Sequence, residues 1–172
     1  MRFAPNILGL LRHLKIPADA AFQGAFVNAK IQLRFLPEGD IEELKRECSR
    51  FRPSVLHFIC HGEADAAGGA SRIVLRRRPD GAPGGALVTH SVSADELVDQ
   101  LTENGGWLPP AIVLNACYAG GTPYRPAPID DTHLPFAAQL VRRGAAISVG
   151  MAGEVADRAC RMFTLRLRAR RC

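Results

Sequence analysis

The chain has 172 residues, 47% of them hydrophobic and 23% charged, which is enough for one globular domain with a sizeable core. It contains no apolar run near the roughly 18 residues that span a bilayer, and charge interrupts its first apolar segment too soon for a secretory signal. We therefore expect a cytoplasmic protein with no membrane partner. The net charge of +5 is mostly arginine without interleaved aromatic residues, so direct nucleic-acid binding is not expected.

The five cysteines are odd in number and irregular in spacing, and no two of them form a CxxC pair. This pattern favours neither a disulfide framework nor a zinc ribbon, and it fits a reducing compartment. His57, Cys60, His61 and Cys117 have the residue types of zinc ligands, but neighbouring side chains of a strand point to opposite faces. We therefore expect no metal and no cofactor.

The first third of the chain predicts a helix over Asn6–Leu14, a strand over Ile31–Leu36 and a second helix over 41–51. Asp40 has the position of an N-cap for the second helix, and Glu43 would complete a capping box. No strand precedes the first helix, and the chain finishes abruptly in arginines. The sequence is therefore expected to be part of a longer protein.

Two apolar runs each end beside a reactive side chain. Ser54–Cys60 is typical of a central parallel strand buried on both faces, and His61 follows it. Ala111–Asn115 predicts a second buried strand, and Cys117 follows it after one alanine. Because the carboxyl ends of parallel strands meet at one edge of a sheet, we expect the imidazole and the thiol to lie together there.

The segment between these runs predicts a hairpin-like excursion. Residues 63–70 are small and glycine-rich and predict a loop. Ile73–Arg77 and Ala86–Thr89 then predict a pair of strands joined by turn residues. Ser93 is placed to cap the helix ADELVDQL, with Glu96 completing a capping box.

The last third predicts a loop over Gly120–Thr132, a helix over Leu134–Arg143, a buried strand over Ala145–Met151 and a helix over Val155–Arg168. Strands that alternate with helices in this way are typical of an α/β fold. We therefore expect a single domain over residues 1–172, a three-layer α/β/α sandwich with a mainly parallel central sheet.

A thiol beside an imidazole forms a pair of nucleophile and base. The imidazole stabilises the thiolate, which is scarce at neutral pH, and it protonates the leaving amine when an acyl-enzyme forms. The backbone N–H groups of Gly62 and Cys117 are suited to hold the oxyanion, because Gly62 has no Cβ to obstruct a close approach. The pattern indicates a cysteine protease with His61 and Cys117 as its catalytic residues.

Five sequence blocks occur in a fixed order between Ser54 and Leu167: HFICHG, SRIVL, ADELVDQL, IVLNACYAG and FAAQLVRRGAAISVGM. In this order they resemble the CHAT domains, bacterial relatives of caspases among the caspase-like (clan CD) cysteine peptidases. The resemblance implies a caspase-like fold, a dyad of His61 and Cys117, and hydrolysis of a peptide bond in a protein substrate.

The same resemblance indicates where substrate binds. Asn115 stands two residues before the thiol, at a position that family members use in the wall of the specificity pocket. Caspases carry Gln there and metacaspases Asp, so a neutral Asn does not predict a strict preference for Arg or Lys. Asp130 and Asp131, in the loop after the nucleophile, are candidates to supply negative charge instead.

Family members commonly sit beside sensor or helical-repeat domains and cut a partner protein in bacterial defence or cell-death signalling, which the resemblance implies for this chain. One alternative stays open, a proteolytically inactive caspase-like scaffold that binds a signalling partner through the same fold. The presence of both dyad residues in the sequence favours the enzyme.

Overall fold

The computed structural model describes residues 25–27, 32–63, 71–79, 85–121 and 134–153. The chain divides into two compact units, one of Glu38–Glu154 and one of Met1–Pro37 with Val155–Cys172. Several predicted features lie outside the described residues: the helices at 6–14 and 155–168, most of the loop at 63–70, and nearly all of the loop at 120–132 with its two aspartates.

In the unit that holds both chain ends, two short strands form an antiparallel pair. β2 (Gln32–Arg34) confirms the middle of the strand predicted over Ile31–Leu36. Its partner is β1 (Ala25–Val27), which the sequence did not predict. Three residues carry too little alternation to identify a strand by themselves.

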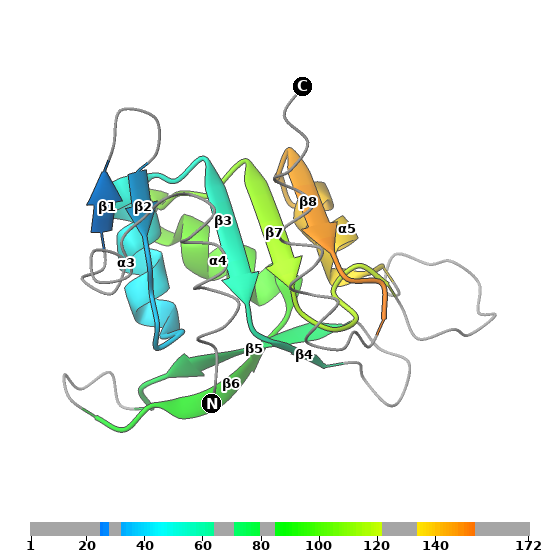
Figure 1. The fold of residues 1–172 in the computed structure, drawn as a ribbon, viewed down its shortest axis with the longest axis horizontal. Helices are drawn as coiled ribbons and strands as arrows, with labels where there is room; N and C mark the ends of the chain where they lie inside the picture. The colour runs from blue at the N-terminus through cyan, green and yellow to red at the C-terminus, as the bar shows by residue number, and fades with distance from the viewer. Residues whose placement is uncertain (1–24, 28–31, 64–70, 80–84, 122–133, 154–172) are drawn as a thin grey trace. The chain divides into compact units, whose positions relative to one another are not determined.

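The Glu38–Glu154 unit contains two sheets of three strands each (Figure 1). One sheet is parallel in the order β3, β7, β8, and the other is antiparallel in the order β4, β5, β6. In Figure 1 the arrowheads of β3 and β7 point toward the antiparallel sheet. The bounds are β3 Val55–Ile59, β4 His61–Glu63, β5 Arg72–Arg77, β6 Val88–Val92, β7 Ala111–Asn115 and β8 Ile147–Gly150.

β7 is the central strand of the parallel sheet, and its predicted bounds, Ala111–Asn115, are confirmed. Ile112 and Leu114 on this strand are buried. The prediction that β3 is a central strand buried on both faces is wrong, because among the described strands it pairs only with β7 and Val55 is 57% exposed. β8 is not fully buried either, with Ile147 60% exposed. β3 and β8 lie on either side of β7, and the first residue of each of these two outer strands is exposed to solvent.

The unit has three described helices, and a short 3₁₀ turn follows the second of them. They are α3 (Ile41–Phe51), α4 (Ala94–Thr102), η1 (Glu103–Gly105) and α5 (Phe136–Arg142). Figure 1 shows α4 and α5 on one face of the parallel sheet. Side chains that are at most 1% exposed form the core between these elements: Leu97, Leu101, Ile112, Leu114, Phe136 and Leu140. None of the described helices is both long and apolar enough to cross a bilayer.

These elements confirm an α/β protein with a parallel sheet. The description of the sheet as mainly parallel holds for β3, β7 and β8, whereas the other three strands of the unit form a separate antiparallel sheet. The third layer of the predicted sandwich stays a prediction, because two of the predicted helices lie outside the described residues.

Local capping explains where the helices begin. The capping box predicted for α4 is confirmed: the N–H of Glu96 donates to Ser93 Oγ at 3.2 Å, and the N–H of Ser93 donates to Glu96 Oε2 at 2.8 Å. α3 begins directly after Asp40, as predicted, but the capping box with Glu43 does not form. Asp40 Oδ1 instead accepts a hydrogen bond from the N–H of Glu42 at 3.1 Å.

The antiparallel sheet departs most from the sequence prediction. Glu63 was predicted to begin a loop, but His61–Glu63 forms the strand β4, which pairs with β5. β6 extends three residues beyond Thr89, the predicted end of its strand. A strand as short as β4 is defined by its partner rather than by its own sequence, so periodicity alone does not reveal it.

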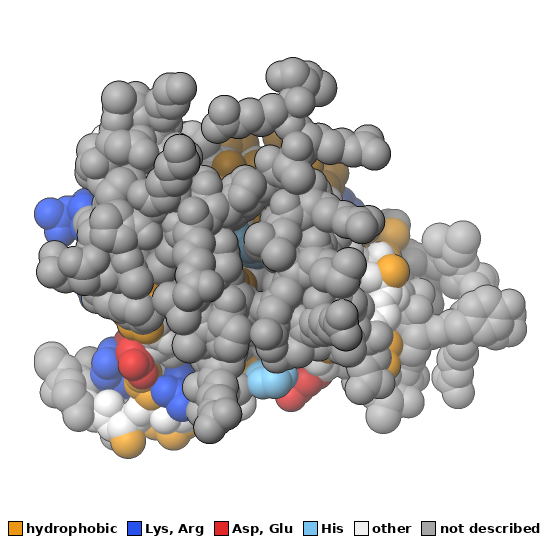
Figure 2. Space-filling view, viewed as in Figure 1, with side chains coloured by type: hydrophobic (Ala, Val, Ile, Leu, Met, Phe, Trp, Pro, Cys, Tyr) orange, Lys and Arg blue, Asp and Glu red, His pale blue; other side chains and the backbone are white. Residues whose placement is uncertain are grey.

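Ion pairs join β5 to the start of α3. Arg76 Nη1 lies 3.3 Å from Glu38 Oε2, and the N–H of Arg76 donates to the carbonyl of Gly39 at 2.9 Å. Arg78 pairs with Asp40, whose side chain is almost fully buried. Figure 2 shows basic and acidic side chains side by side at the lower left, over the hairpin of β5 and β6. These contacts hold the far end of β5 against α3.

Candidate active site

Gly62 and Cys117 are in backbone contact although one lies in the antiparallel sheet and the other follows a strand of the parallel sheet. Gly62 is the middle residue of β4, and Cys117 lies in the turn that follows β7. A Cβ at Gly62 would lie 1.8 Å from the carbonyl oxygen of Cys117 and 3.0 Å from its nitrogen, so only glycine allows this approach. The contact brings His61, the neighbour of Gly62, to the same edge of the parallel sheet as Cys117. Their roles in catalysis stay a prediction.

His61 lies on the exposed face of the antiparallel sheet. Its register partner on β5 is Val74, whose own partner on β6 is Ser91, so the three side chains form a row across the sheet. Gly62 and Ile73 form the next pair and face the other way, where Ile73 is fully buried. The imidazole therefore projects from the solvent side of β4, whereas the contact with Cys117 lies on the opposite side of the strand, toward which a Cβ at Gly62 would point.

The turn that carries Cys117, residues 116–121, packs backbone against backbone on residues 150–153. A Cβ at Gly120 or at Gly121 would lie within 2.2 Å of a carbonyl oxygen of the facing segment. Such distances leave room for glycine alone at both positions. We call residues 116–121 the nucleophile turn, and its position is set by main-chain contacts on two sides.

Tyr118, directly after the thiol, has a φ of 57°, in the left-handed region that residues with a Cβ rarely adopt. Its N–H donates to the carbonyl of Gly153 at 3.1 Å, and the N–H of Gly120 donates to the carbonyl of Met151 at 2.6 Å. A strained residue of this kind persists where the surrounding contacts over-determine it, and such residues cluster at functional sites. Apart from the small residues around Tyr118, no feature of the sequence indicates this conformation.

The start of α5 joins the nucleophile turn to the antiparallel sheet. The N–H of Ala137 donates to the carbonyl of Ala119 at 2.8 Å. The N–H of Phe136 donates to Ser71 Oγ at 3.0 Å, and Ser71, which directly precedes β5, is buried. The first N–H groups of a helix have no acceptor within the helix. In α5, two of them are accepted by the turn after β7 and by the residue that precedes β5.

The three described cysteines differ in their surroundings. Burial, reinforced by the charge of Glu47, raises the pKa of Cys48 to about 11. Burial raises the pKa of Cys60 to about 12, against the opposing effect of a backbone hydrogen bond with Val74. Both thiols therefore carry very little thiolate at neutral pH. Cys117 lies half-buried in its turn.

The family model of the CHAT domain matches residues 16–168 of the chain. The chain belongs to the CHAT domain family. This family is related to the caspase-like cysteine peptidases, which confirms the resemblance seen in the ordered blocks between Ser54 and Leu167. No curated protein and no solved structure matches the chain.

The predicted substrate-binding residues of this CHAT domain fall into two groups. Asn115, at the end of β7, is 5% exposed and pairs in register with Ile59. Its carbonyl accepts a hydrogen bond from the N–H of Cys60 at 3.3 Å, which ties the ends of β3 and β7 together. Asp130 and Asp131 lie outside the described residues. The role of all three in substrate binding stays a prediction.

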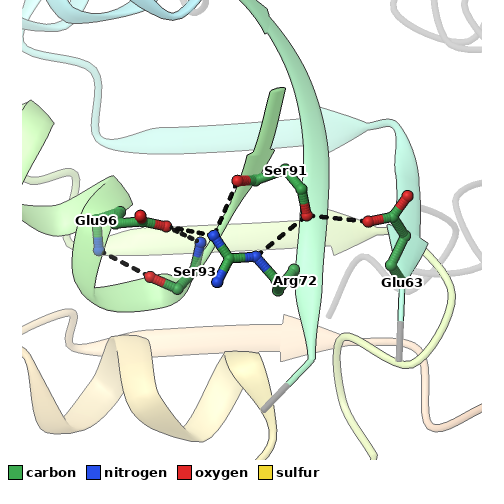
Figure 3. A network of polar contacts seen from close by, with 5 residues as sticks. All are labelled: Glu63, Arg72, Ser91, Ser93 and Glu96. Carbon is green, nitrogen blue, oxygen red and sulfur yellow. Dashed lines mark hydrogen bonds and ion pairs between the residues drawn. The ribbon is translucent and has the colours of Figure 1, made fainter. Parts of the chain in front are cut away.

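Figure 3 shows a polar network that the sequence did not reveal. By strand register, its residues on β4, β5 and β6 lie on the same face of the antiparallel sheet as His61. Ser91 Oγ donates to Glu63 Oε2 at 2.9 Å and accepts from Arg72 Nε at 3.1 Å. Arg72 Nη2 donates to Glu96 Oε2 at 2.7 Å. The network joins all three strands of the antiparallel sheet to α4. The one signal in the sequence is that Glu63 stands two residues after His61, which places both on one face of a strand.

Proposed function

We propose that this CHAT domain is a cysteine endopeptidase that cuts a peptide bond in a partner protein, with Cys117 as nucleophile and His61 as base and acid. The observation that carries the proposal is the contact of Gly62 with the backbone of Cys117, because it brings the strand of His61 to the nucleophile turn. Membership of a family related to caspase-like peptidases supports the same class of reaction.

In the first half of the reaction, the thiolate of Cys117 attacks the carbonyl carbon of the substrate and forms a carbon–sulfur bond. The carbonyl oxygen becomes an oxyanion in the tetrahedral state. The imidazolium of His61 then gives its proton to the nitrogen of the leaving amine, and the carbon–nitrogen bond breaks. A thioester and a neutral imidazole are left.

In the second half, the neutral imidazole of His61 takes a proton from water, and the water oxygen attacks the thioester carbon. A carbon–oxygen bond forms and the carbon–sulfur bond breaks. The new carboxyl terminus is released, and the thiolate and imidazolium are restored. No other reactant is required.

The oxyanion is held in this proposal by the backbone N–H groups of Gly62 and Cys117. Their nitrogens belong to two segments in direct contact, since a Cβ at Gly62 would lie 3.0 Å from the nitrogen of Cys117. Each donor in such a site is typically worth about 3 kcal/mol of transition-state stabilisation. The rigid packing of the nucleophile turn supports this role, because preorganised donors need no rearrangement during the reaction.

The substrate is proposed to be a protein, and Asn115 is proposed to form part of the pocket that receives the side chain before the scissile bond. A neutral amide at that position suits recognition by hydrogen bonds rather than by charge. The proposed setting, a sensor or helical-repeat partner in bacterial defence or cell-death signalling, rests on the family resemblance.

The thiol chemistry is tested by labelling with a thiol-directed peptidyl inhibitor, followed by the mass of the intact chain and of its peptides. We expect the parent to gain one inhibitor at Cys117 and the Cys117→Ala variant to gain none. Cys60→Ala is the matched control, since Cys60 is a thiol nearby with a raised pKa, and it should label as the parent does.

Incubation with proteins encoded by neighbouring genes tests the endopeptidase activity itself. Cleavage that His61→Ala and Cys117→Ala both abolish is the expected result. In the inhibitor experiment, labelling of Cys117→Ala as strong as that of the parent would overturn the proposal. Binding of a partner without cleavage, unchanged by either substitution, would instead establish the inactive scaffold.

A further inference from the structure

The residues of the network in Figure 3 lie next to His61 in the register of the antiparallel sheet. Ser91 lies in the same cross-strand row as His61, two positions along, with Val74 between them. Glu63 and Arg72 are directly opposite each other in the next row on that face. The side chains of the network are therefore the neighbours of the imidazole on the sheet.

The hydrogen bonds of the network have a defined direction, from Arg72 to Ser91 and from Ser91 to Glu63. The Nε of Arg72 can only donate, so the hydroxyl of Ser91 accepts from it and directs its own hydrogen to Glu63. At the other end, Arg72 Nη2 donates to the carbonyl of Ser91 at 2.9 Å and to Glu96 Oε2 at 2.7 Å. Glu96 Oε2 also accepts from the N–H of Ser93 at 2.8 Å, which fixes this end on α4.

β4 is the element that gains most from such an anchor. It has three residues and, among the described strands, pairs only with β5. Its other contact with the candidate site is the close approach of Gly62 to Cys117, which leaves no tolerance for a shift of the strand. The hydrogen bond from Ser91 to Glu63 ties the last residue of β4, the end farther along the chain from β3.

We propose that Ser91 and Arg72 are positioning residues for His61, which hold β4 in place beside the nucleophile turn by anchoring Glu63 to α4. The inference rests on the proposed function. Neither residue touches the reacting atoms in this proposal. They act through the backbone of β4, and a small displacement of a catalytic group is enough to reduce its effect strongly.

The test is the pH profile of alkylation of Cys117 by iodoacetamide, followed by mass spectrometry of the peptide that contains Cys117. This readout needs no knowledge of the substrate. From the proposed function we expect Cys117 of the parent to be alkylated at about pH 6, the acid limb of the profile, and His61→Ala to lose this acid limb. At about pH 9.5 an ordinary thiol is ionised, so both proteins react there.

Ser91→Ala removes the one hydroxyl that links Arg72 to Glu63. We expect alkylation of Cys117 to fall roughly tenfold at the acid end and to stay unchanged at the alkaline end. Ser91→Thr keeps the hydroxyl and should restore the acid limb. Thr102→Ala is the matched control, because the hydroxyl of Thr102 donates to the carbonyl of Val98 within α4 and takes no part in the network, and this variant should keep the profile of the parent.

The outcomes separate the inference from the proposed function. An acid limb in the parent that is lost in His61→Ala but kept in Ser91→Ala overturns the inference and leaves the proposed function standing. A parent profile that already equals that of His61→Ala overturns both. A loss in Ser91→Ala that is equal at every pH shows general disturbance of the fold and also overturns the positioning role.

Discussion

The nucleophile turn and the strand β4 meet at the candidate site but are held in place by different kinds of contact. The turn is fixed by main-chain hydrogen bonds and by glycines whose backbones touch the facing segment. β4 is fixed by three residue pairs with β5 and by a chain of side-chain hydrogen bonds at the surface.

The difference shows which side of the site is tolerant of change. Main-chain contacts at van der Waals distance leave no room for even one additional carbon atom. A network of exposed side chains responds instead to pH, salt and conservative substitution. We therefore expect the thiol side to be rigid and the histidine side to be adjustable, and the following predictions test that contrast from the largest effect to the smallest.

Gly62→Ala should produce the largest effect, because it lies where the two sides touch. Its Cβ would lie 1.8 Å from the carbonyl oxygen of Cys117, so either β4 or the nucleophile turn must move. We expect a loss of about 3 kcal/mol in the free energy of unfolding. Alkylation of Cys117 at acid pH should fall by about a hundredfold. Urea unfolding and the alkylation assay measure the two effects.

Gly153→Ala is the control for this substitution. Apart from its chain neighbours, no atom of the described residues would lie within 4 Å of a Cβ at Gly153, although the carbonyl of Gly153 accepts the hydrogen bond from Tyr118. Its stability and alkylation should stay close to those of the parent. Equal losses in both variants would show that added bulk anywhere near the turn is harmful, and the special role of Gly62 would be refuted.

Ser71→Ala tests the connection between the two sides through α5. The hydroxyl of Ser71 accepts from the N–H of Phe136 at 3.0 Å, and both residues are buried. Without it, a buried N–H has no acceptor, which typically costs about 1–3 kcal/mol. Chemical unfolding of the variant and the parent at the same pH measures the difference.

Ser148→Ala offers the same chemical change on the parallel sheet with the opposite expectation. Ser148 Oγ is buried and makes no hydrogen bond within the described part of the structure. Its removal should leave the stability unchanged or raise it slightly. A cost as large as that of Ser71→Ala would mean that lost volume, rather than the lost acceptor, explains both results.

The same contrast separates what the sequence predicts well from what it does not. The bounds of β7 follow from an apolar run between Pro110 and Ala116, and those of α3 from Asp40 before it and Pro53 after it. These signals come from residues adjacent to each element in the sequence, so they predict its bounds without knowledge of the fold. The approach of the chain after β3 to the turn after β7, seen in the contact of Gly62 with Cys117, was likewise expected from the rule that parallel strands end at one edge.

The histidine side was predicted less well because its structure depends on distant partners. β4 is a strand only by virtue of β5, and its three residues look like the start of a loop. The network that joins Glu63 to Glu96 draws on four separate elements, and no spacing in the sequence relates them. Burial of β3 was overestimated for the same reason, since an apolar run does not reveal how many neighbours a strand has.

The smallest expected effect concerns the charge of Glu96 at the α4 end of the network. Hydrogen bonding to Ser93 first, with a contribution from the nearby charge of Arg72, lowers the pKa of Glu96 below its ordinary value of 4.5. A carboxylate whose pKa is lowered by folding stabilises the folded state above its unfolded pKa, and this stabilisation is lost as the pH falls through the folded value. The side chain is half exposed, so we expect the effect to be at most about 1 kcal/mol.

Glu96→Gln isolates the contribution of this charge to the free energy of unfolding, because glutamine preserves the shape of the capping box but carries no charge. Urea unfolding should show the parent more stable than the variant at neutral pH. The difference should shrink as the pH falls below about 4.5. A difference that stays constant across this range would assign the effect to shape rather than charge, and the histidine side would then be less adjustable than the network indicates.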